Sequence, residues 1–341
     1  MRQHHTETPA TVRAFRDLTP TVREFDIQPH GHLRPWTVGS HLTIHMPLPT
    51  GTETRSYSLV GTPHAAGASE VYRIAVKRAA PSRGGSAFMW NLKLGDALTI
   101  AGPNNHFELS FNAPQYLLVA GGIGITPLLG MAQMLAERGA DVRMRYAARH
   151  ASELAYAGEL QAALGDRLRC ITDAVGEPLD LPAEIAALQP RAQLWICGPM
   201  PLLDAAKDAW AHAGRAAPDL RFETFGNTGR ADAEPFWVEL PRHGLRLDVP
   251  ADRSLLDVLS AAGIDTLFDC RRGECGLCAM DVIRADGTID HRDVFFSAHE
   301  KQRNQQLCAC VSRVSGGGVV LDTAYRPDGH VGHTSTTFLP L

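Results

Sequence analysis

The sequence predicts a multidomain chain with three folds in series: an antiparallel β-barrel, a Rossmann-like α/β domain and an α+β domain. Short β-type runs separated by turn residues occupy residues 11–108, and apolar strands then alternate with amphipathic helices. Five of the seven cysteines lie within residues 270–310. A length of 341 residues has room for two or three domains. We place the domains at residues 1–110, 111–228 and 229–341.

The first domain is predicted from short alternating runs such as residues 41–46 and 72–77. Prolines and glycines between the runs provide turns, and this spacing is typical of a small antiparallel barrel. A short helix is expected after Gly84-Gly85-Ser86, because serine is a residue type that caps helices.

The second domain is predicted from a change of pattern near residue 114. Residues 116–120 are a continuous apolar run, which indicates a strand buried on both faces. Residues 127–138 carry apolar side chains at helical spacing, and strands and helices then alternate as far as Glu223. This alternation predicts a parallel sheet covered by helices, including one over residues 152–164.

The third domain follows residues 226–235, a polar stretch with the composition of a linker. Residues 236–240 and 245–249 are predicted to form a hairpin. Ser254 is predicted to cap a helix that ends at Ala262.

The cysteines of this domain have the spacing C-x4-C-x2-C with two further cysteines downstream: Cys270, Cys275, Cys278, Cys308 and Cys310. Three thiolates on one loop and a fourth from a distance are the ligands of a plant-type [2Fe–2S] cluster. Gly273 and Gly276 suit a loop that wraps closely around sulfur. Zinc sites usually combine two Cys or Cys/His pairs, and disulfide frameworks belong to small secreted domains, so both are weaker alternatives.

Composition argues against several other classes of protein. There are 33 basic and 37 acidic residues, and the net charge of −4 does not favour nucleic-acid binding. No run of about 18 apolar residues is present, so no membrane span is expected, and the N-terminal residues lack the apolar run of a signal peptide. Cysteines that serve as metal ligands indicate a reducing compartment, for which the cytoplasm is the natural choice.

Two motifs in the first domain indicate a flavin. Arg55-Ser56-Tyr57-Ser58 offers a cation, hydroxyls and a flat ring on one strand, as a flavin's phosphate and ring system require. Arg83-Gly84-Gly85-Ser86 leads into a helix start, where free N–H groups attract a phosphate. A surface strand and an ordinary capped turn are the plain alternatives.

Two turns in the second domain indicate a dinucleotide. Gly121-Gly122-Ile123-Gly124-Ile125-Thr126-Pro127 lies between a buried strand and a helix, and Cys197-Gly198-Pro199 ends a later strand in the same way. The carboxyl ends of parallel strands meet at one edge, so the two turns are expected to shape a nucleotide cleft. The alternative for Cys197 is a buried structural thiol.

With these motifs assembled, the chain resembles the phthalate dioxygenase reductase and vanillate O-demethylase reductase family. The matching segments, which include Phe222-Glu223-x-Phe225 and Val311-Ser312-Arg313, cover residues 11–323 in the family's order. The resemblance implies an FMN-binding barrel, an NADH-binding domain and a β-grasp ferredoxin domain. It implies a reductase that takes hydride from NADH to FMN and passes single electrons through the cluster to a terminal Rieske non-haem iron oxygenase.

The resemblance also implies roles for individual residues. It places Ser58 and Phe225 at the reacting end of the flavin, and it makes Cys310, which stands before Val-Ser-Arg, the fourth ligand in preference to Cys308. Cofactor contacts are implied for Arg55, Ser56, Tyr57, Ser58, Ala75, Lys77, Arg83, Gly84, Gly85, Ser86, Gly121, Gly122, Gly124, Thr126, Pro127, Cys197, Gly198, Pro199 and Phe225. The expected assembly is a monomer.

Three alternatives stay open. Arg149-His150 stands where the family often has an acidic residue, and a cation there could accept the 2′-phosphate of NADPH. The electron acceptor could be a diiron hydroxylase or a separate ferredoxin. A pure electron carrier would not oxidise nicotinamide at all, and the paired glycine turns argue against it.

Overall fold

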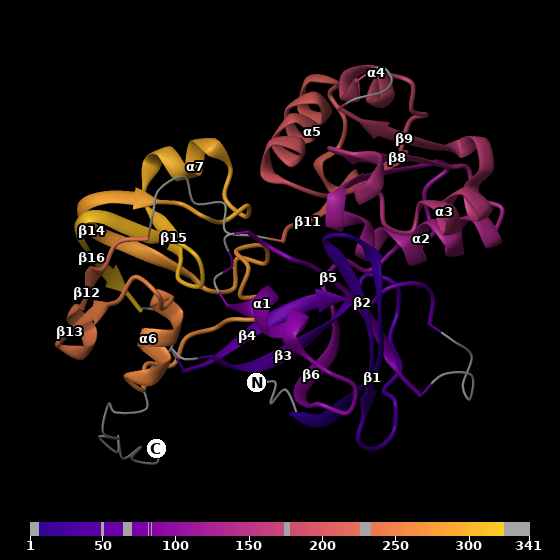
Figure 1. Ribbon diagram of the computed structural model, residues 1–341. Coiled ribbons are helices and arrows are strands. Elements are labelled where there is room, and N and C mark those ends of the chain that lie inside the picture. The colour runs from indigo at the N-terminus through magenta and orange to yellow at the C-terminus, as the bar shows by residue number, and fades with distance from the viewer. Residues whose placement is uncertain are drawn as a thin grey trace, which may run out of the picture. The chain divides into compact units, whose positions relative to one another are not determined.

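The computed structural model describes residues 7–48, 51–63, 70–80, 82, 84–173, 178–225 and 233–323. The chain divides into two compact units, Met1–Phe225 and Gly226–Leu341 (Figure 1). Within the described residues, two of the sheets belong to the first unit and one to the second. The boundaries that we predicted at residues 110/111 and 228/229 stay predictions. Arg83 lies outside the described residues.

The first sheet is antiparallel throughout and has the order β4-β3-β6-β1-β2-β5. Its strands are β1 (Thr8–Thr19), β2 (Val22–Pro29), β3 (Ser40–Leu48), β4 (Gly51–Ser58), β5 (Tyr72–Lys77) and β6 (Ala97–Asn105). A bridge between Leu59 and Ile74 joins the two edge strands, which closes the sheet toward a barrel. Alternate side chains of the strands fill its core, as the period-2 pattern predicts.

The short helix of this domain begins two residues earlier than capping by Ser86 would place it. Helix α1 (Gly85–Asn91) has Gly84 at its N-cap, and no side chain caps it. Ser86 was expected to be the capping residue, and this was wrong, because its hydroxyl accepts instead from the backbone N–H of Ala79 at 3.1 Å.

The second sheet is parallel throughout and has the order β11-β10-β7-β8-β9. Its strands are β7 (Tyr116–Gly121), β8 (Val142–Ala148), β9 (Leu168–Thr172), β10 (Gln193–Cys197) and β11 (Leu220–Glu223). The helices α2 (Ile125–Glu137) and α3 (Ala157–Leu164) lie on one face, and α4 (Leu181–Ala186) and α5 (Met200–His212) lie on the other (Figure 1). The strand order reverses between β7 and β10, which is where open α/β sheets bind ligands.

Two elements of this domain differ from the sequence prediction. The helix expected over residues 152–164 is divided into the 3₁₀ turn η2 (Ala151–Glu153) and α3, because Tyr156 has a left-handed backbone with φ 62°. Helix α4 was not predicted, although Asp180 caps it and Pro182 occupies its first turn, which is a recognisable start signal.

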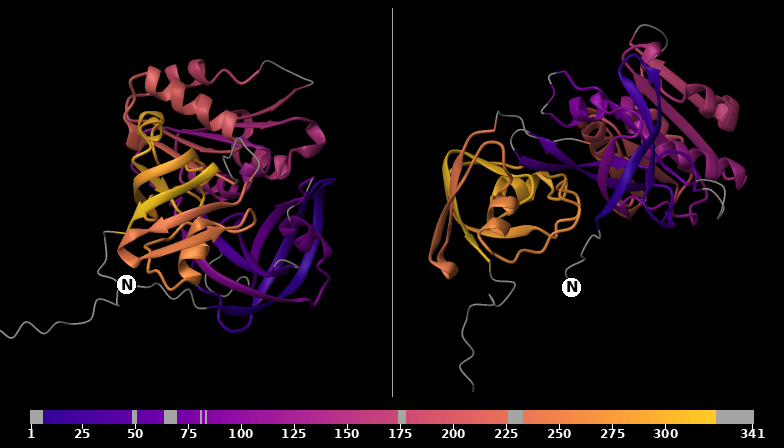
Figure 2. Two further views of the ribbon diagram at one scale, coloured as in Figure 1. Left: turned by 90° about the vertical axis from the view of Figure 1, so that its left-hand side faces the viewer. Right: turned by 60° about the horizontal axis from the view of Figure 1, so that its bottom comes forward.

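The third sheet is mixed and has the order β13-β12-β16-β14-β15, with only β12 and β16 parallel to each other. Its strands are β12 (Phe236–Leu240), β13 (Leu245–Val249), β14 (Ala279–Asp290), β15 (Gln306–Cys308) and β16 (Arg313–Asp322). The sheet curves around α6 (Leu255–Ala261), whose leucines enter the core, while α7 (Ala298–Arg303) precedes β15 (Figure 2). The predicted hairpin is found with its predicted bounds, and Ser254 caps α6.

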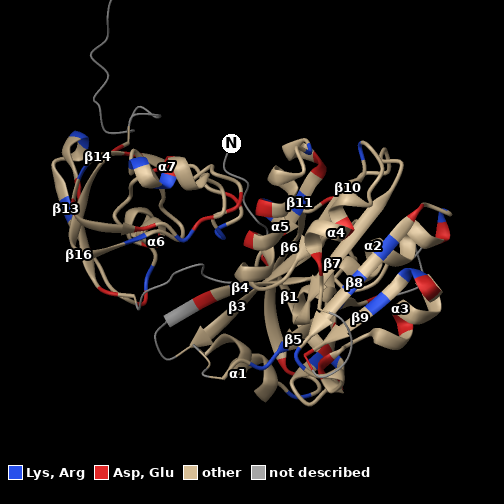
Figure 3. Cartoon of the chain, turned by 90° about the horizontal axis from the view of Figure 1, so that it is seen from above, with Lys and Arg blue, Asp and Glu red and all other residues tan. Residues whose placement is uncertain are grey.

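Basic and acidic residues are interspersed over the described parts of both units (Figure 3). In these same residue ranges, no helix is long and apolar enough to cross a membrane.

Arg313, which follows Val-Ser in the family motif, is a buried anchor of the second unit. Its guanidinium donates to the carbonyls of Arg253, Glu234 and Pro250, each at 2.8 Å. These carbonyls belong to the start of the unit and to the turn before α6, so one side chain ties both to β16.

We predict that Arg313→Met lowers the free energy of unfolding of this unit by about 3 kcal/mol, because the buried Arg313 side chain loses its hydrogen bonds to three carbonyls. The matched control is Arg246→Met, which removes an exposed guanidinium 4.0 Å from the Trp237 ring centroid and should cost less than about 1 kcal/mol. Differential scanning calorimetry measures both. Equal losses in the two variants would contradict the assigned role.

Candidate functional site

The loop after α6 wraps around the sulfur of Cys270. The backbone N–H groups of Arg272, Glu274 and Cys275 donate to this sulfur, each at 3.4 Å. Such a wrap needs the loop backbone to come close to its own thiol, and N–H donors around a sulfur stabilise the thiolate form.

Two glycines allow the loop to pass its neighbours. Gly273 and Gly276 have φ of 74° and 72°, a conformation that other residues rarely adopt. A Cβ on Gly273 would lie 2.8 Å from the Cα of Asp293, and one on Gly276 would lie 2.3 Å from the ring of Phe295. The prediction that these glycines serve a tight wrap therefore has a steric basis in the fold.

The thiols of the loop and of the β15–β16 turn are arranged in pairs. Cys270 and Cys275 are hydrogen-bonded to each other, and the Sγ atoms of Cys278 and Cys310 are 3.2 Å apart. The hydrogen bond from Cys275, assisted by the backbone amides, lowers the pKa of Cys270 to about 6. Hydrogen bonds from Cys308 and Cys310 lower the pKa of Cys278 to about 3.

This donor set fits a [2Fe–2S] cluster, in which each of the two irons takes two thiolates. In the described ranges, no three His, Cys, Asp or Glu side chains are grouped so that they could hold one metal ion. The two thiol pairs match a cluster with two irons, which distributes its ligands over two centres.

The two downstream cysteines occupy different surroundings. Strand β15 ends at Cys308, and residues 309–311 form a turn in which the N–H groups of Val311 and Ser312 donate to the Cys308 carbonyl. The sulfur of Cys310 accepts from the N–H of Gly273 in the cysteine loop. Cys308 is fully buried in the core of the unit, beside Cys278. The segment from Cys308 to Cys310 is therefore a turn and not extended, although the thiols of both cysteines reach Cys278.

The Arg-Ser-Tyr-Ser motif lies on β4, as predicted. Arg55 pairs with the carboxylate of Glu53, and burial raises the pKa of Tyr57. The hydroxyl of Ser56 is 3.2 Å from that of Thr43 on the neighbouring strand β3. The motif is therefore held in the barrel wall by its own strand and by β3.

The glycine turn before α1 lies against the same arginine. A Cβ on Gly85 would be 3.1 Å from the Cγ and Nε of Arg55, so the arginine packs across the turn, and one on Gly84 would be 2.9 Å from Leu48. The hydroxyl of Ser86 is 3.0 Å from that of Ser82. The structure thus brings the two predicted flavin motifs together, with Ser86 engaged within the chain.

The turns after β7 and β10 pack against each other. A Cβ on Gly124 would lie 2.1 Å from the carbonyl oxygen of Cys197, and one on Gly121 would lie 2.6 Å from Pro199. A Cβ on Gly198 would lie 3.1 Å from Gly121. These three glycines are thus required for the close approach of two turns, whereas the sequence had suggested that they make room for a ligand.

Gly122 is the glycine of this motif that faces open space. It has φ of 54°, and the nearest atom to a Cβ there would be the Nζ of Lys77 at 3.9 Å. Thr126 and Pro127 are buried, and the Thr126 hydroxyl donates to the Ile123 carbonyl at 3.0 Å. A ligand at this edge would therefore meet Gly122 and Lys77 before it met the other predicted residues.

The barrel and the parallel sheet meet at polar contacts. Ser58, at the end of β4, donates to the carboxylate of Glu223 at 3.3 Å, and both residues are buried. The Nζ of Lys77 is 3.7 Å from the carboxylate of Glu153, while Ala75 is buried in β5. Sequence reasoning missed Glu223 and Glu153 as site residues, although Glu223 stands inside the Phe-Glu-x-Phe segment.

Phe225 follows β11 directly after this contact and is 38% exposed. Its side chain is therefore not part of the hydrophobic core.

Comparison with known proteins gives a consistent result. Residues 238–315 match the family model described as a 2Fe-2S iron-sulfur cluster binding domain. The chain is 38% identical over 313 residues to the heme-dependent oxidative N-demethylase beta subunit of Ectopseudomonas mendocina, covering 91% of this chain and 97% of that one.

Solved structures also match over nearly the whole chain. Phthalate dioxygenase reductase, described as a modular structure for electron transfer from pyridine nucleotides to [2Fe-2S], is 31% identical with a TM-score of 0.75, covering 94% of this chain and 99% of that one. Full-length CYP116B46 from Tepidiphilus thermophilus, a longer protein, is 33% identical with a TM-score of 0.67. The chain spans 42% of its length, and the match covers 92% of this chain.

We predict that Gly124→Ala destabilises the first unit by about 3 kcal/mol, because its methyl group would overlap the Cys197 carbonyl. Gly158→Ala in α3 is the matched control. Its methyl group would meet no atom within 4 Å, and it should stabilise the unit by about 0.5–1 kcal/mol. Urea denaturation followed by tryptophan fluorescence measures both, and an unchanged midpoint for Gly124→Ala would contradict the packing argument.

Proposed function

The chain belongs to the phthalate dioxygenase reductase and vanillate O-demethylase reductase family, and on this premise we propose that it takes hydride from NADH to FMN and delivers single electrons through a [2Fe–2S] cluster to a terminal Rieske non-haem iron oxygenase. The observation that carries the proposal is the presence, in one chain, of the paired thiols around Cys278 and the buried Ser58–Glu223 contact between barrel and parallel sheet.

The barrel residues are proposed to bind the flavin. Arg55 supplies positive charge beside the Gly84–Gly85 turn, where the missing Cβ atoms let Leu48 and Arg55 pack against the backbone. Ser56 and Tyr57 lie on β4 and Ala75 lies on β5, the two edge strands that the Leu59–Ile74 bridge joins. Ser58, together with its acceptor Glu223, presents a hydroxyl whose proton is directed by a buried carboxylate. Arg83 and Ser86 stay in the proposed set on the resemblance alone. When bound, the flavin would supply the conversion of a two-electron hydride into single electrons.

The edge at the β7–β10 switch point is proposed to bind the dinucleotide. Gly122 offers open backbone, and Lys77 is a cation within reach of a pyrophosphate there. The remaining turn residues shape this edge mainly by packing. Gly121, Gly124, Thr126, Pro127 and Cys197 are buried, Gly198 is half-buried, and Pro199 is exposed.

Phe225 is proposed to lie where the nicotinamide must stack, and its partial exposure is compatible with movement. NADH is proposed as the donor, and the exposed Arg149 is the residue that would favour NADPH instead.

Cys270, Cys275, Cys278 and Cys310 are proposed as the cluster ligands. The amide donors around Cys270 and the Gly273 amide at Cys310 would reach ligand sulfurs, and such hydrogen bonds are one of the factors that set cluster potentials. Because all three cofactor sites fall within one chain, we propose that the protein acts as a monomer. Cysteines used as metal ligands support a cytoplasmic location.

A haem-dependent oxygenase is the second candidate acceptor. The relative from Ectopseudomonas mendocina is named as the beta subunit of a heme-dependent oxidative N-demethylase, and the chain also covers 42% of full-length CYP116B46. Rapid mixing of the reduced protein with purified oxygenases of both classes distinguishes them, since only the true acceptor will be reduced at a catalytically competent rate.

We predict that Cys310→Ser loses the cluster and the transfer of electrons to an oxygenase, while reduction of ferricyanide by NADH stays within about twofold, since ferricyanide can take electrons from the flavin. Cys308→Ser is the matched control and should keep its iron and its rhombic electron paramagnetic resonance signal. The opposite pattern, with the signal intact in Cys310→Ser and lost in Cys308→Ser, would identify Cys308 as the ligand.

We predict about one equivalent of FMN per chain. The Arg55–Gly85 packing places positive charge at the end of the proposed site, where FMN ends in its phosphate. Acid release of the flavin followed by chromatography identifies it, and recovery of FAD would refute the assignment.

A further inference from the structure

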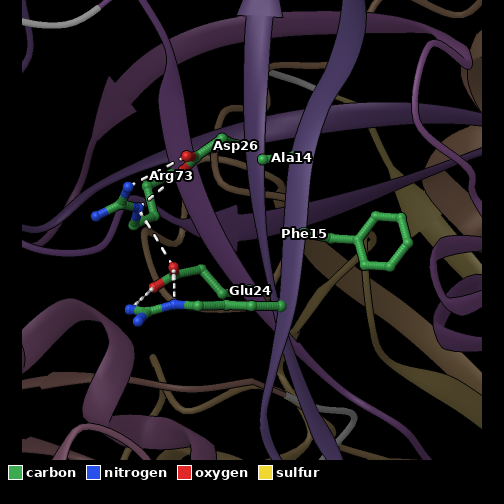
Figure 4. Close-up of a pocket in the computed structure, with 6 residues that line it drawn as sticks. Ala14, Phe15, Glu24, Asp26 and Arg73 are labelled. Atoms are coloured by element: carbon green, nitrogen blue, oxygen red, sulfur yellow. Dashed lines mark hydrogen bonds and ion pairs between the residues drawn. The ribbon is translucent and has the colours of Figure 1, made fainter.

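A pocket of about 320 Å³ lies on strands β1, β2 and β5 of the barrel, apart from the sites described above (Figure 4). Its lining consists of Ala14, Phe15, Arg16, Glu24, Asp26 and Arg73. The charged side chains of Glu24, Asp26 and Arg73 point toward one another, while Phe15 points away from them.

The charges of this pocket satisfy one another. Arg16 donates to Glu24 at 2.6 and 3.3 Å, and Arg73 donates to Asp26 at 2.8 and 3.2 Å. The Nε of Arg73 is also 3.5 Å from Glu24. Two guanidinium groups and two carboxylates leave no excess charge for a ligand, so the group is better explained as a structural network.

A residue of the nucleotide-binding domain completes the network. The hydroxyl of Tyr156 donates to the carboxylate of Glu24 at 2.8 Å, and Tyr156 is 6% exposed. Burial, followed by the neighbouring Glu24 carboxylate, raises the pKa of Tyr156, so the hydroxyl keeps its proton and remains a donor. Glu159 on α3 adds a weaker link at 3.6 Å to Arg16. The barrel and the parallel sheet are therefore joined through Glu24.

Tyr156 also ends the loop that follows β8, residues 149–156. Its left-handed backbone interrupts the helical conformation between η2 and α3. The same loop contains Glu153, which pairs with Lys77 beside the open Gly122. In dinucleotide-binding folds the segment after the second strand contacts the adenosine ribose. The loop thus has the proposed nucleotide edge at one end and the Glu24 network at the other.

We propose that the Tyr156–Glu24 hydrogen bond clamps the 149–156 loop to the flavin barrel and so positions the dinucleotide for the flavin. Tyr156 acts here as a positioning residue that does not touch the cofactor. The inference rests on the proposed function, because it concerns how that site is held together.

The test uses the full-length holoprotein with Tyr156→Phe, which removes only the hydroxyl. We expect the KM for NADH to rise about tenfold, the order expected for loss of one buried hydrogen bond to a carboxylate, with kcat within about twofold. The flavin content and the electron paramagnetic resonance signal of the reduced cluster should be unchanged. Glu24→Gln combined with Tyr156→Phe should raise the KM for NADH by less than the product of the two single effects, because both substitutions weaken the same Tyr156–Glu24 contact.

Tyr116→Phe is the matched control. Tyr116 is 2% exposed, and its hydroxyl accepts from the Ala113 N–H at 3.0 Å at the opposite end of the sheet, where β7 begins. Its KM for NADH should equal that of the wild type.

An unchanged KM in Tyr156→Phe, or an equal rise in Tyr116→Phe, would overturn the clamp while leaving the proposed function in place. A flavin-loaded wild-type protein that does not oxidise NADH would overturn the proposed function, and the clamp with it.

Discussion

The steric fit between the turns after β7 and β10 is the constraint on which the first unit depends. The absence of a side chain on Gly124 lets its backbone touch the Cys197 carbonyl, and Gly121 and Gly198 fit together in the same way. This contact joins the two halves of the parallel sheet at the point where strand order reverses, and it fixes the edge to which Gly122 belongs. The accessible backbone at Gly122 is thus held in place by the tight packing of the neighbouring glycines Gly121 and Gly124.

The cysteine loop of the second unit follows the same physical logic. Gly273 and Gly276 let the backbone approach Asp293 and Phe295, and this approach brings amide donors around Cys270. In both units, glycines permit close contact between the backbone and a neighbouring segment. This contact positions backbone N–H groups around Cys270 in one unit and leaves the backbone accessible at Gly122 in the other. The motifs are recognisable in sequence because this requirement is local and has few chemical solutions.

Features that depend on local sequence were predictable from it, and features made by distant contacts were not. The hairpin of β12 and β13, the Ser254 cap and the glycine turns each follow from adjacent residues. The Ser58–Glu223 and Tyr156–Glu24 contacts join residues 165 and 132 positions apart, and nothing in the neighbourhood of either glutamate indicates its partner. The break at Tyr156 was missed for the same reason, because a tyrosine has no intrinsic preference for a left-handed backbone, and tertiary contacts with Glu24 hold it there.

Within the first unit, two sets of charged side chains differ in how firmly they are paired. One set, around Glu24, lies at the junction of the barrel and the parallel sheet, and the other, around Lys77, lies at the proposed nucleotide edge. At the junction, Glu24 accepts from Arg16 and Tyr156 at hydrogen-bond distance, so its geometry is determined from two directions. At the edge, Lys77 is 3.7 Å from Glu153 and 38% exposed, an arrangement that leaves the ammonium group able to change partners. The buried side chains of Glu24 and Tyr156 are hydrogen-bonded to each other and resist displacement. Lys77 is partly exposed and loosely paired, so its ammonium group can turn toward an incoming phosphate at low energetic cost. The barrel and the parallel sheet are therefore held rigidly by one set of charges while a second set remains available for the nucleotide.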